Sequence, residues 1–205
     1  MAARGMLRAS LARYTGDSPS ALRFRYGPVG KPQLDGPLGG TISFNLAHSH
    51  HLALLAVARG THVGVDIERV SDADDVAISR GFFAPAEQRA LAELPPAQRR
   101  AAFYHCWVCK EAFVKARGDG LALDRFAVRV NPAAPATLLH VDNNPDEAVR
   151  WRLTTITTEE GFVAALCIGY VTVSDGPHPP NPLSLSGHIV THIFFTAVQC
   201  GVSAP

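Results

Sequence analysis

The sequence predicts an α+β fold, in which strands and helices occupy separate stretches of the chain. Residues 21–70 and 126–173 have the alternating patterns of strands, whereas residues 75–117 have the apolar spacing of helices. The length of 205 residues suits one domain, or two small halves that share a core. Helices that lie between two strand-rich regions favour the α+β class over an all-helical or an all-β protein.

The first part of this pattern predicts one helix followed by strands. Leu7 and Leu11 are four residues apart, which places them on one face of a helix. Apolar and basic residues then alternate from 22 to 26, as in a half-buried strand, and the Gly- and Pro-rich stretch 27–40 predicts a loop. We expect the helix at 6–14 and strands at 21–27, 41–47, 52–58 and 62–70.

The second part of the pattern predicts two helices and then strands. Pro85 is suited to the first turn of a short helix, which Pro95 and Pro96 end. A longer helix follows from 97 to 117, and Gly118 is suited to close it. We expect the later strands at 126–130, 137–141, 151–157 and 162–173.

The last part of the chain differs from the rest in composition. Residues 174–187 contain four prolines and read as a linker, whereas residues 188–202 are apolar again. This apolar stretch is either an additional strand or sequence outside the ancestral domain. We therefore divide the chain into an N-terminal half at 1–63, a C-terminal half at 64–173, and a linker with an atypical tail at 174–205.

Composition and charge exclude several classes of protein. The chain is 47% hydrophobic and has a formal net charge of +1, which fits a soluble folded protein and disfavours nucleic acid as a partner. No apolar run reaches the ~18–20 residues of a membrane-spanning helix. Four cysteines without a dense framework fit a reducing compartment. We expect a cytoplasmic protein with no membrane partner.

A pair of acidic residues lies on the strand predicted at 62–70. Because side chains alternate along a strand, Val63, Val65 and Ile67 share one face, and Asp66 and Glu68 share the other. Two neighbouring carboxylates repel each other unless a cation lies between them, so this pair is a candidate half-site for a divalent metal. The alternative is two solvated acids on an exposed face.

The long helix supplies a third carboxylate and two lysines. Glu111 follows Trp107 by four residues and so borders the apolar side of the helix, and Lys115 follows Glu111 by four. Only three of the 19 basic residues are lysines, and Lys110 and Lys115 are two of them. A metal and an ammonium group beside a carboxylate suit phosphoryl transfer. The alternative is an ordinary surface Glu–Lys pair.

Several blocks of the chain together resemble the 4′-phosphopantetheinyl transferase superfamily, and their order and spacing resemble its long, pseudodimeric branch. The resemblance covers about residues 7–170, and its most specific block has the pattern W-x-x-K-E-A-x-x-K. The matching blocks are Gly30-Lys31-Pro32, Phe44-Asn45-Leu46-Ala47-His48-Ser49, Gly64-Val65-Asp66-Ile67-Glu68, Phe82-Phe83 with Glu87, residues 103–115, and Gly118-Asp119-Gly120-Leu121.

The resemblance implies an activity and a set of partners. Members transfer 4′-phosphopantetheine from coenzyme A to a serine of an apo carrier protein of fatty-acid, polyketide or nonribosomal-peptide synthesis, as holo-[acyl-carrier-protein] synthases do, and they require Mg²⁺. It also implies two similar α/β half-domains packed around a shared cleft. We expect a monomer of this kind.

The resemblance also implies roles for single residues. Asp66, Glu68 and Glu111 would hold Mg²⁺, and Glu111 would also take the proton of the serine hydroxyl, directly or through water. Lys115 would stabilise or protonate the leaving 3′,5′-ADP. The other coenzyme A contacts it implies are Lys110 beside the phosphates, Lys31 and Pro32 at the adenine, and His48 at a phosphate.

Two departures from the family pattern are visible in this sequence. Ala47 stands where the family usually has serine, so one hydroxyl near the phosphates is absent. Long-branch members also carry a basic segment and a strand before the helix expected at 6–14. We therefore expect an incomplete first half, with a weakened coenzyme A site. A non-catalytic remnant that binds coenzyme A or a carrier protein is the first alternative, and a metal-dependent nuclease of the D-x-E kind is a less favoured one.

Two other motifs do not lead to a site. Cys106 and Cys109 form a C-x-x-C pair, but they lie in mid-helix, whereas a redox pair lies at a helix N-terminus. A zinc site needs a second matched pair, which Cys167 and Cys200 do not form. The histidine-rich turn 48–51 has no spaced cysteine or aspartate partner, which favours a turn with one functional histidine over a metal site.

Overall fold

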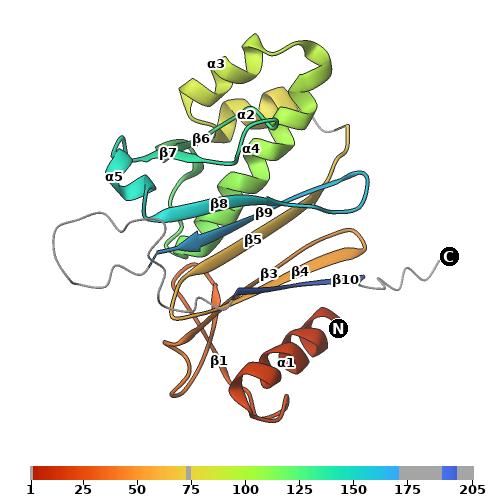
Figure 1. Cartoon of the computed structure of the whole chain (residues 1–205), viewed down its shortest axis with the longest axis vertical. Coiled ribbons are helices and arrows are strands. Elements are labelled where there is room, and N and C mark those ends of the chain that lie inside the picture. Colours follow the sequence, from red (N-terminus) through yellow and green to blue (C-terminus); the bar gives the residue numbers. More distant parts are fainter. Residues whose placement is uncertain (1, 73–74, 171–190, 198–205) are drawn as a thin grey trace.

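The computed structural model describes residues 2–72, 75–170 and 191–197 (Figure 1). The helices are α1 (Ala2–Thr15), α2 (Asp75–Phe82), α3 (Pro85–Glu93), α4 (Pro96–Arg117) and α5 (Pro145–Ala148), and a 3₁₀ turn covers Leu123–Arg125. The strands are β1 (Phe24–Tyr26), β2 (Pro32–Leu34), β3 (Ile42–Ser49), β4 (Leu52–Arg59), β5 (Val63–Arg69), β6 (Phe126–Val128), β7 (Leu138–Val141), β8 (Trp151–Ile156), β9 (Phe162–Gly169) and β10 (Thr191–Ala197).

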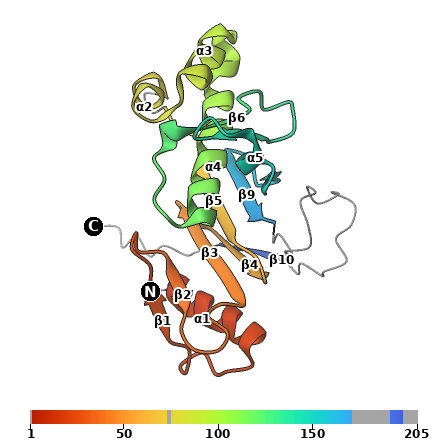
Figure 2. The same cartoon turned by 90° about the vertical axis from the view of Figure 1, so that its left-hand side faces the viewer.

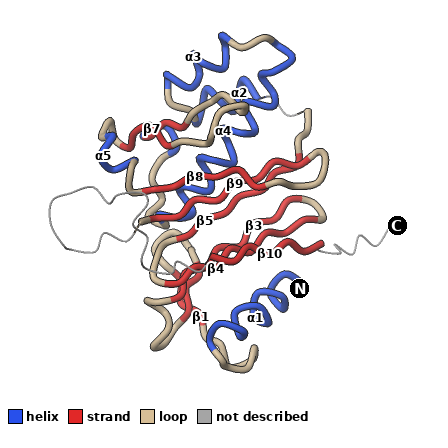
Figure 3. The backbone as a smooth tube through the Cα atoms, viewed as in Figure 1, coloured by secondary structure: helices blue, strands red, loops and turns tan. Residues whose placement is uncertain are grey.

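Two antiparallel sheets of three strands form the centre of the molecule. Their strand orders are β10-β4-β3 and β5-β9-β8, and two small hairpins, β1-β2 and β6-β7, lie outside them. Strand β3 of the first sheet lies beside β5 of the second, so the six strands follow one another across Figure 3 from β8 to β10. The carboxylate-bearing strand β5 therefore lies at the junction of the two sheets.

Helices cover the two sheets separately. The long helix α4 packs on the second sheet, where Phe113 and Ala116 share a buried cluster with Ala165 and Cys167. Helix α1 covers the first sheet at the other end of the molecule (Figure 2), and its fully buried Leu11 belongs to a cluster with residues of β3 and β4. A third cluster, of β4, β5 and β9 side chains, joins the two sheets. Each sheet thus has its own helical layer.

The α+β class predicted from the sequence is confirmed, and most elements lie within a few residues of their expected positions. The predicted loop 27–40 contains the short strand β2, which pairs with β1. Helices α2 and α5 were not predicted individually; α5 has only four residues, too few to give a periodic pattern. The division at 63/64 and 173/174 remains a prediction.

The tail contains one described element. Strand β10 pairs with β4 in the first sheet, so the apolar stretch 188–202 includes an additional strand, one of the two alternatives. The predicted linker 174–187 lies outside the described residues. Among the described residues, no helix is both long and apolar enough to cross a membrane.

Candidate active site

The site is built where helix α4 crosses strand β5. At the crossing, Gly64 lies so close to the helix that an added Cβ atom would be 2.2 Å from both the Ala112 carbonyl oxygen and the Ala116 amide nitrogen. Only glycine leaves room for the helix backbone at this point. This close approach brings the carboxylates of β5 next to residues 111–115 of α4.

Asp66 and Lys115 form the centre of the site. The Lys115 ammonium donates a hydrogen bond of 2.5 Å to Oδ1 of Asp66. The Asp66 side chain is 4% exposed and that of Lys115 is 31% exposed, so Asp66 is buried beneath a lysine that solvent can reach. The other oxygen of Asp66, Oδ2, is buried and has no hydrogen-bond partner. A buried carboxylate oxygen without a partner is costly and marks a place where a ligand or ion is expected.

Burial raises the pKa of Asp66 to about 7. The Lys115 ammonium acts in the opposite direction, and the neighbouring carboxylates of Glu68 and Glu111 raise the pKa further. Removal from water therefore outweighs the ion pair, as expected for a carboxylate with one unsatisfied oxygen. Asp66 has a pKa shift of the kind that clusters at functional sites.

The two other predicted carboxylates lie beside this pair. Glu111 is one turn before Lys115 on α4, with its Oε2 3.9 Å from the Lys115 Nζ, and its side chain is 25% exposed. Glu68 shares the face of β5 with Asp66 and accepts a hydrogen bond of 3.1 Å from the Ser49 hydroxyl. The structure thus gathers Asp66, Glu111 and Lys115, with Glu68 at the margin.

The donor atoms suit a hard divalent cation. Mg²⁺ is bound through one or two carboxylates together with substrate phosphates, so it does not need a complete protein cage. The partnerless Oδ2 of Asp66 is such a donor. The residues that the structure describes do not include a ready-made group of three ligands. Asp66 fits Mg²⁺, and the carboxylates of Glu68 and Glu111 lie close enough to Asp66 to raise its pKa.

Lys110 lies elsewhere, and this differs from the prediction that it contacts phosphates. Its side chain is fully buried, and its ammonium donates to both oxygens of Glu87 at 2.9 and 2.7 Å and to the Phe126 carbonyl at 2.7 Å. An ammonium has three protons, and all three are used in the interior. Adjacent helix positions point about 100° apart, which explains why Lys110 and Glu111 have such different surroundings.

Lys31 binds the end of α4. Its ammonium donates to the Val63 carbonyl oxygen of β5 and to the carbonyl oxygens of Lys115 and Ala116. The last two lie in the final turn of α4, where carbonyl groups lack partners within the helix. Burial lowers the pKa of Lys31 to about 8. Pro32 is half-buried beside it. With its three protons engaged, Lys31 offers only its alkyl stem to a nucleotide.

His48 is exposed on β3, on the strand that lies beside β5. Two polar residues of the same strand join the sheets, and the sequence reasoning assigned them no role. The Asn45 side-chain oxygen accepts from the Val65 amide at 2.8 Å, and the Ser49 hydroxyl accepts from the Arg69 amide at 3.0 Å. Asn45 and Ser49 are four residues apart, as are Val65 and Arg69. This equal spacing is the only feature of the sequence that could have indicated their role.

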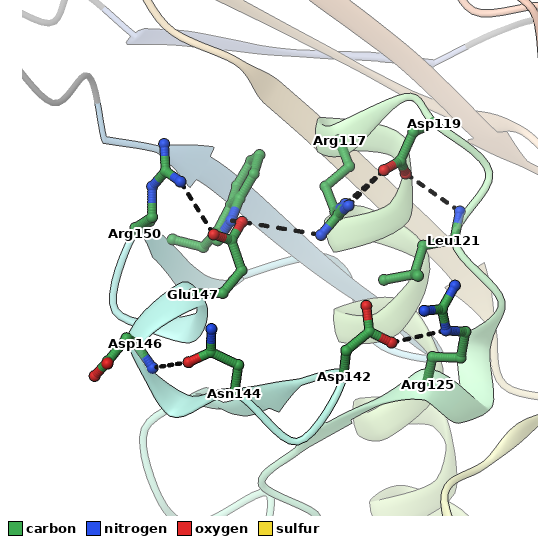
Figure 4. Close-up of polar contacts among 10 residues, drawn as sticks. Arg117, Asp119, Leu121, Arg125, Asp142, Asn144, Asp146, Glu147 and Arg150 are labelled. Carbon is green, nitrogen blue, oxygen red and sulfur yellow. Dashed lines mark hydrogen bonds and ion pairs between the residues drawn. The ribbon is translucent and has the colours of Figure 1, made fainter.

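An ion-pair network holds the C-terminal end of α4 (Figure 4). The Arg117 guanidinium donates to Asp119, and it lies 3.9 Å from Glu147 of α5. Glu147 in turn accepts from Arg150 and from the Trp151 indole. This network fixes the turn after α4, three residues from Lys115, but no role for it was predicted.

The C-x-x-C pair is buried, as expected for small residues of a packed helix. Burial raises the pKa of Cys109 to about 12 and raises the pKa of Cys106 well above its usual range. A redox thiol needs a lowered pKa, so these cysteines are packing residues.

Comparisons with known proteins agree with this arrangement. The family described as the 4′-phosphopantetheinyl transferase superfamily matches residues 62–167. The 4′-phosphopantetheinyl transferase HetI of Nostoc sp. is 35% identical over 170 residues, which are 82% of this chain and 69% of that protein. A 4′-phosphopantetheinyl transferase of Bacillus subtilis is 30% identical over 83% of this chain and 74% of its own length.

Among solved structures, the holo-[acyl-carrier-protein] synthase of Thermotoga maritima is 20% identical with a TM-score of 0.43, over 53% of this chain and 62% of that one.

Strand β5 and helix α4, which bring Asp66, Glu111 and Lys115 together, both contribute these residues from within the stretch that the superfamily matches. The chain belongs to the 4′-phosphopantetheinyl transferase superfamily.

Proposed function

We propose that this protein transfers 4′-phosphopantetheine from coenzyme A to a serine hydroxyl of an apo carrier protein, with Mg²⁺ as cofactor. One observation carries the proposal: in this chain, which belongs to the superfamily, Glu111, Lys115 and the partnerless carboxylate oxygen of Asp66 lie together. These groups supply a base, an ammonium and a metal ligand, which are the parts that phosphoryl transfer requires.

In the proposed reaction, the serine oxygen forms a bond to the phosphorus atom that bears the pantetheine arm, and the bond from that phosphorus to 3′,5′-ADP breaks. Glu111 takes the serine proton, directly or through water, and its partial exposure supports this role. The Lys115 ammonium donates a hydrogen bond or a proton to the leaving phosphate. The enzyme needs no covalent intermediate.

Asp66, Glu68 and Glu111 would hold the Mg²⁺ ion, which when bound neutralises charge on the pyrophosphate of coenzyme A. Before it binds, the Lys115 ammonium is the positive charge next to Asp66. His48, which is exposed on β3, would contact a phosphate, and Pro32 with the stem of Lys31 would contact the adenine. Lys110 is left out of the proposed binding site because its ammonium is enclosed.

The carrier-protein partner is supported by charge. Carrier proteins are typically acidic helical bundles, which favours arginines as contacts. Arg69 and Arg80 are exposed on β5 and α2. Arg80 also lines a cavity of about 950 Å³ between α2, α3 and α4, together with Arg89, Arg99 and Arg100. The Arg80→Glu variant would therefore raise the KM for the carrier protein and leave the KM for coenzyme A unchanged.

The whole proposal is tested by incubating the protein with coenzyme A, Mg²⁺ and an apo carrier protein, followed by intact-mass measurement of the carrier. A mass gain of one phosphopantetheine supports the transferase. Binding of coenzyme A without transfer would support the non-catalytic remnant. Cleavage of a nucleic acid in place of transfer would support the nuclease.

A cytoplasmic monomer completes the proposal, and the buried free thiols Cys106, Cys109 and Cys167 fit a reducing compartment.

A further inference from the structure

Lys31 joins the first hairpin to the two elements that carry the candidate active site. Its ammonium donates to the Val63 carbonyl at 3.2 Å, to the Ala116 carbonyl at 3.1 Å and to the Lys115 carbonyl. Val63 is the first residue of β5, which carries Asp66, and the other two acceptors lie in the last turn of α4. Three acceptors thus converge on one ammonium, which has three protons to donate.

The last turn of α4 depends on this ammonium for its hydrogen bonds. The final carbonyl groups of a helix have no acceptor role within it, so they need partners from outside. The Val114 carbonyl accepts from the amide of the C-cap residue Gly118 at 2.8 Å, and the next two carbonyls accept from Lys31. A cation at this end also interacts favourably with the helix dipole. Lys31 therefore holds the turn from which the Lys115 side chain extends.

The same ammonium fixes the helix against the strand. The absence of a side chain at Gly64 allows α4 to approach β5, and Ala116 is one of the residues it faces. Lys31 then binds the carbonyl of that same Ala116 and the carbonyl of Val63, the neighbour of Gly64. Glycine thus permits the close approach, and Lys31 supplies hydrogen bonds that keep the end of the helix in place beside the strand.

The stem of Lys31 is held as well as its head. An added Cβ atom at Gly118, which has φ +73°, would lie 2.9 Å from Cδ of Lys31. An added Cβ atom at Gly120 would lie 2.8 Å from Cγ1 of Val29. The loop before β2 and the turn after α4 are therefore in contact at two points. A lysine packed along its stem and bonded at its head has one orientation, which suits a fixed support.

We propose that Lys31 is a positioning residue for the transfer reaction, because it holds the last turn of α4 so that the Lys115 ammonium stays beside Asp66. Its effect on catalysis rests on the proposed function, whereas its effect on the position of Lys115 does not. The first hairpin is in this way connected to the group that acts on the leaving phosphate. The ammonium of Lys31 supports the site and does not itself touch the substrate.

Amine labelling tests this role without a transfer assay. Lys31→Met removes the ammonium and keeps an unbranched stem, and of the two lysines left in the chain, Lys110 is fully buried. We expect acetic anhydride to label Lys115 at least about threefold faster than in wild type, because local opening of the last turn frees it from Asp66. Lys110 should stay unlabelled, since the rest of the fold is intact. Peptide masses measure both.

The matched control is Arg25→Met, which removes one positive charge from an exposed position of β1 in the same hairpin. It should leave the labelling of Lys115 at the wild-type rate. A second variant, Lys31→Arg, keeps a cation at the end of α4 but replaces the compact ammonium by a planar group. Its labelling of Lys115 should lie between those of wild type and Lys31→Met.

Transfer kinetics separate positioning from nucleotide binding. Because methionine keeps the stem, Lys31→Met should lower kcat at least about tenfold and leave the KM for coenzyme A within about twofold of wild type. Lys31→Arg should recover part of the lost kcat, and Arg25→Met should turn over as wild type does. A raised KM at unchanged kcat would show a contact of the ammonium with the nucleotide and would overturn the inference.

The labelling results decide the inference even if the wild-type protein transfers nothing, an outcome that would refute the proposed function alone. Unchanged labelling of Lys115 in Lys31→Met would overturn the inference. Labelling of Lys110 together with Lys115, or a variant that does not fold, would show that Lys31 serves folding and not positioning. Lys31→Arg that labels as fast as Lys31→Met would contradict the need for a cation at this end of the helix.

Discussion

Helix α4 carries two lysines that each lie against a carboxylate of another element, and the two pairs are built in opposite ways. The Glu87–Lys110 pair is closed. Its side chains are 1% and 0% exposed, and both carboxylate oxygens have partners, including the amides of Ala84 and Val128. The third proton of Lys110 goes to the Phe126 carbonyl. Every polar atom of this pair is satisfied within the protein.

The Asp66–Lys115 pair is open. One oxygen of Asp66 has no partner, and the Lys115 side chain is partly exposed beside Glu111. A buried polar group that is fully bonded rigidifies a fold, whereas one that is partly bonded has capacity for a ligand. The comparison teaches that burial and charge do not by themselves mark function. The unfinished bonding of Asp66 is the observation that supports the proposed site.

The largest effect is expected from breaking the closed pair. Lys110→Met leaves the Glu87 carboxylate buried without its cation, which costs about 3–5 kcal/mol of the free energy of unfolding. The matched control is Lys115→Met, whose partner Asp66 can take up a proton and whose own side chain reaches solvent. Urea denaturation of both variants measures the difference. Equal stability of the two would contradict the division into a closed and an open pair.

The pH dependence of stability tests the open pair. The pKa of Asp66 is about 7 in the folded protein and near 3.8 in an unfolded chain, so the folded state binds an extra proton between these values. Its contribution to stability is full below about pH 4 and is lost as the pH rises through 7. Asp66→Asn does not titrate, so relative to wild type it should gain stability from pH 5 to pH 8, by up to a few kcal/mol. Thermal melting of both proteins across this range measures the difference in stability. A difference between Asp66→Asn and wild type that stayed constant with pH would refute the account.

The crossing that creates the open pair depends on Gly64. In Gly64→Ala the new methyl group would collide with the α4 backbone, and such overpacking costs about 1–3 kcal/mol. Gly81→Ala is the control, because nothing lies within 4 Å of the added atom. We expect Gly64→Ala to unfold at lower urea than wild type, and Gly81→Ala to be unchanged or slightly more stable. Equal behaviour would show that α4 does not need this contact.

A smaller effect, on the rate of transfer, is expected when Lys115 of the open pair is replaced by arginine. Lys115→Arg keeps the charge but replaces a compact ammonium by a planar, bulkier group, which should lower kcat for transfer by roughly tenfold. The melting temperature should change little, since the position is partly exposed. Wild-type turnover in this variant would count against a role of Lys115 at the leaving group.

Much of this arrangement follows from the sequence, and the rest depends on tertiary contacts. Strand alternation placed Asp66 opposite the apolar face of Val63 and Val65, and helical spacing placed Glu111 next to Lys115, because both rules are local. No local rule distinguishes Lys110 from Lys115. Their difference arises because α3 brings Glu87 to one of them and β5 brings Asp66 to the other.

Long-range pairing explains the remaining differences. The Lys31 ammonium bonds carbonyl groups 32–85 residues away, which no local pattern indicates, and the contact of Lys31 with the adenine stays a prediction. Strand β10 pairs with a strand more than 130 residues before it in the chain, and its apolar sequence indicated a strand without indicating a partner. Contacts across such separations leave no periodic pattern, so only the structure reveals them.

The most direct measurement of the central claim compares two glutamate variants in the transfer assay. Glu111→Gln removes the proposed base beside the open pair, and Glu93→Gln makes the same change at an exposed position of α3. The account predicts that an apo carrier protein gains the mass of phosphopantetheine with wild type and Glu93→Gln, whereas Glu111→Gln is at least about 10²-fold slower with an unchanged melting temperature. Transfer by Glu111→Gln at the wild-type rate would contradict it.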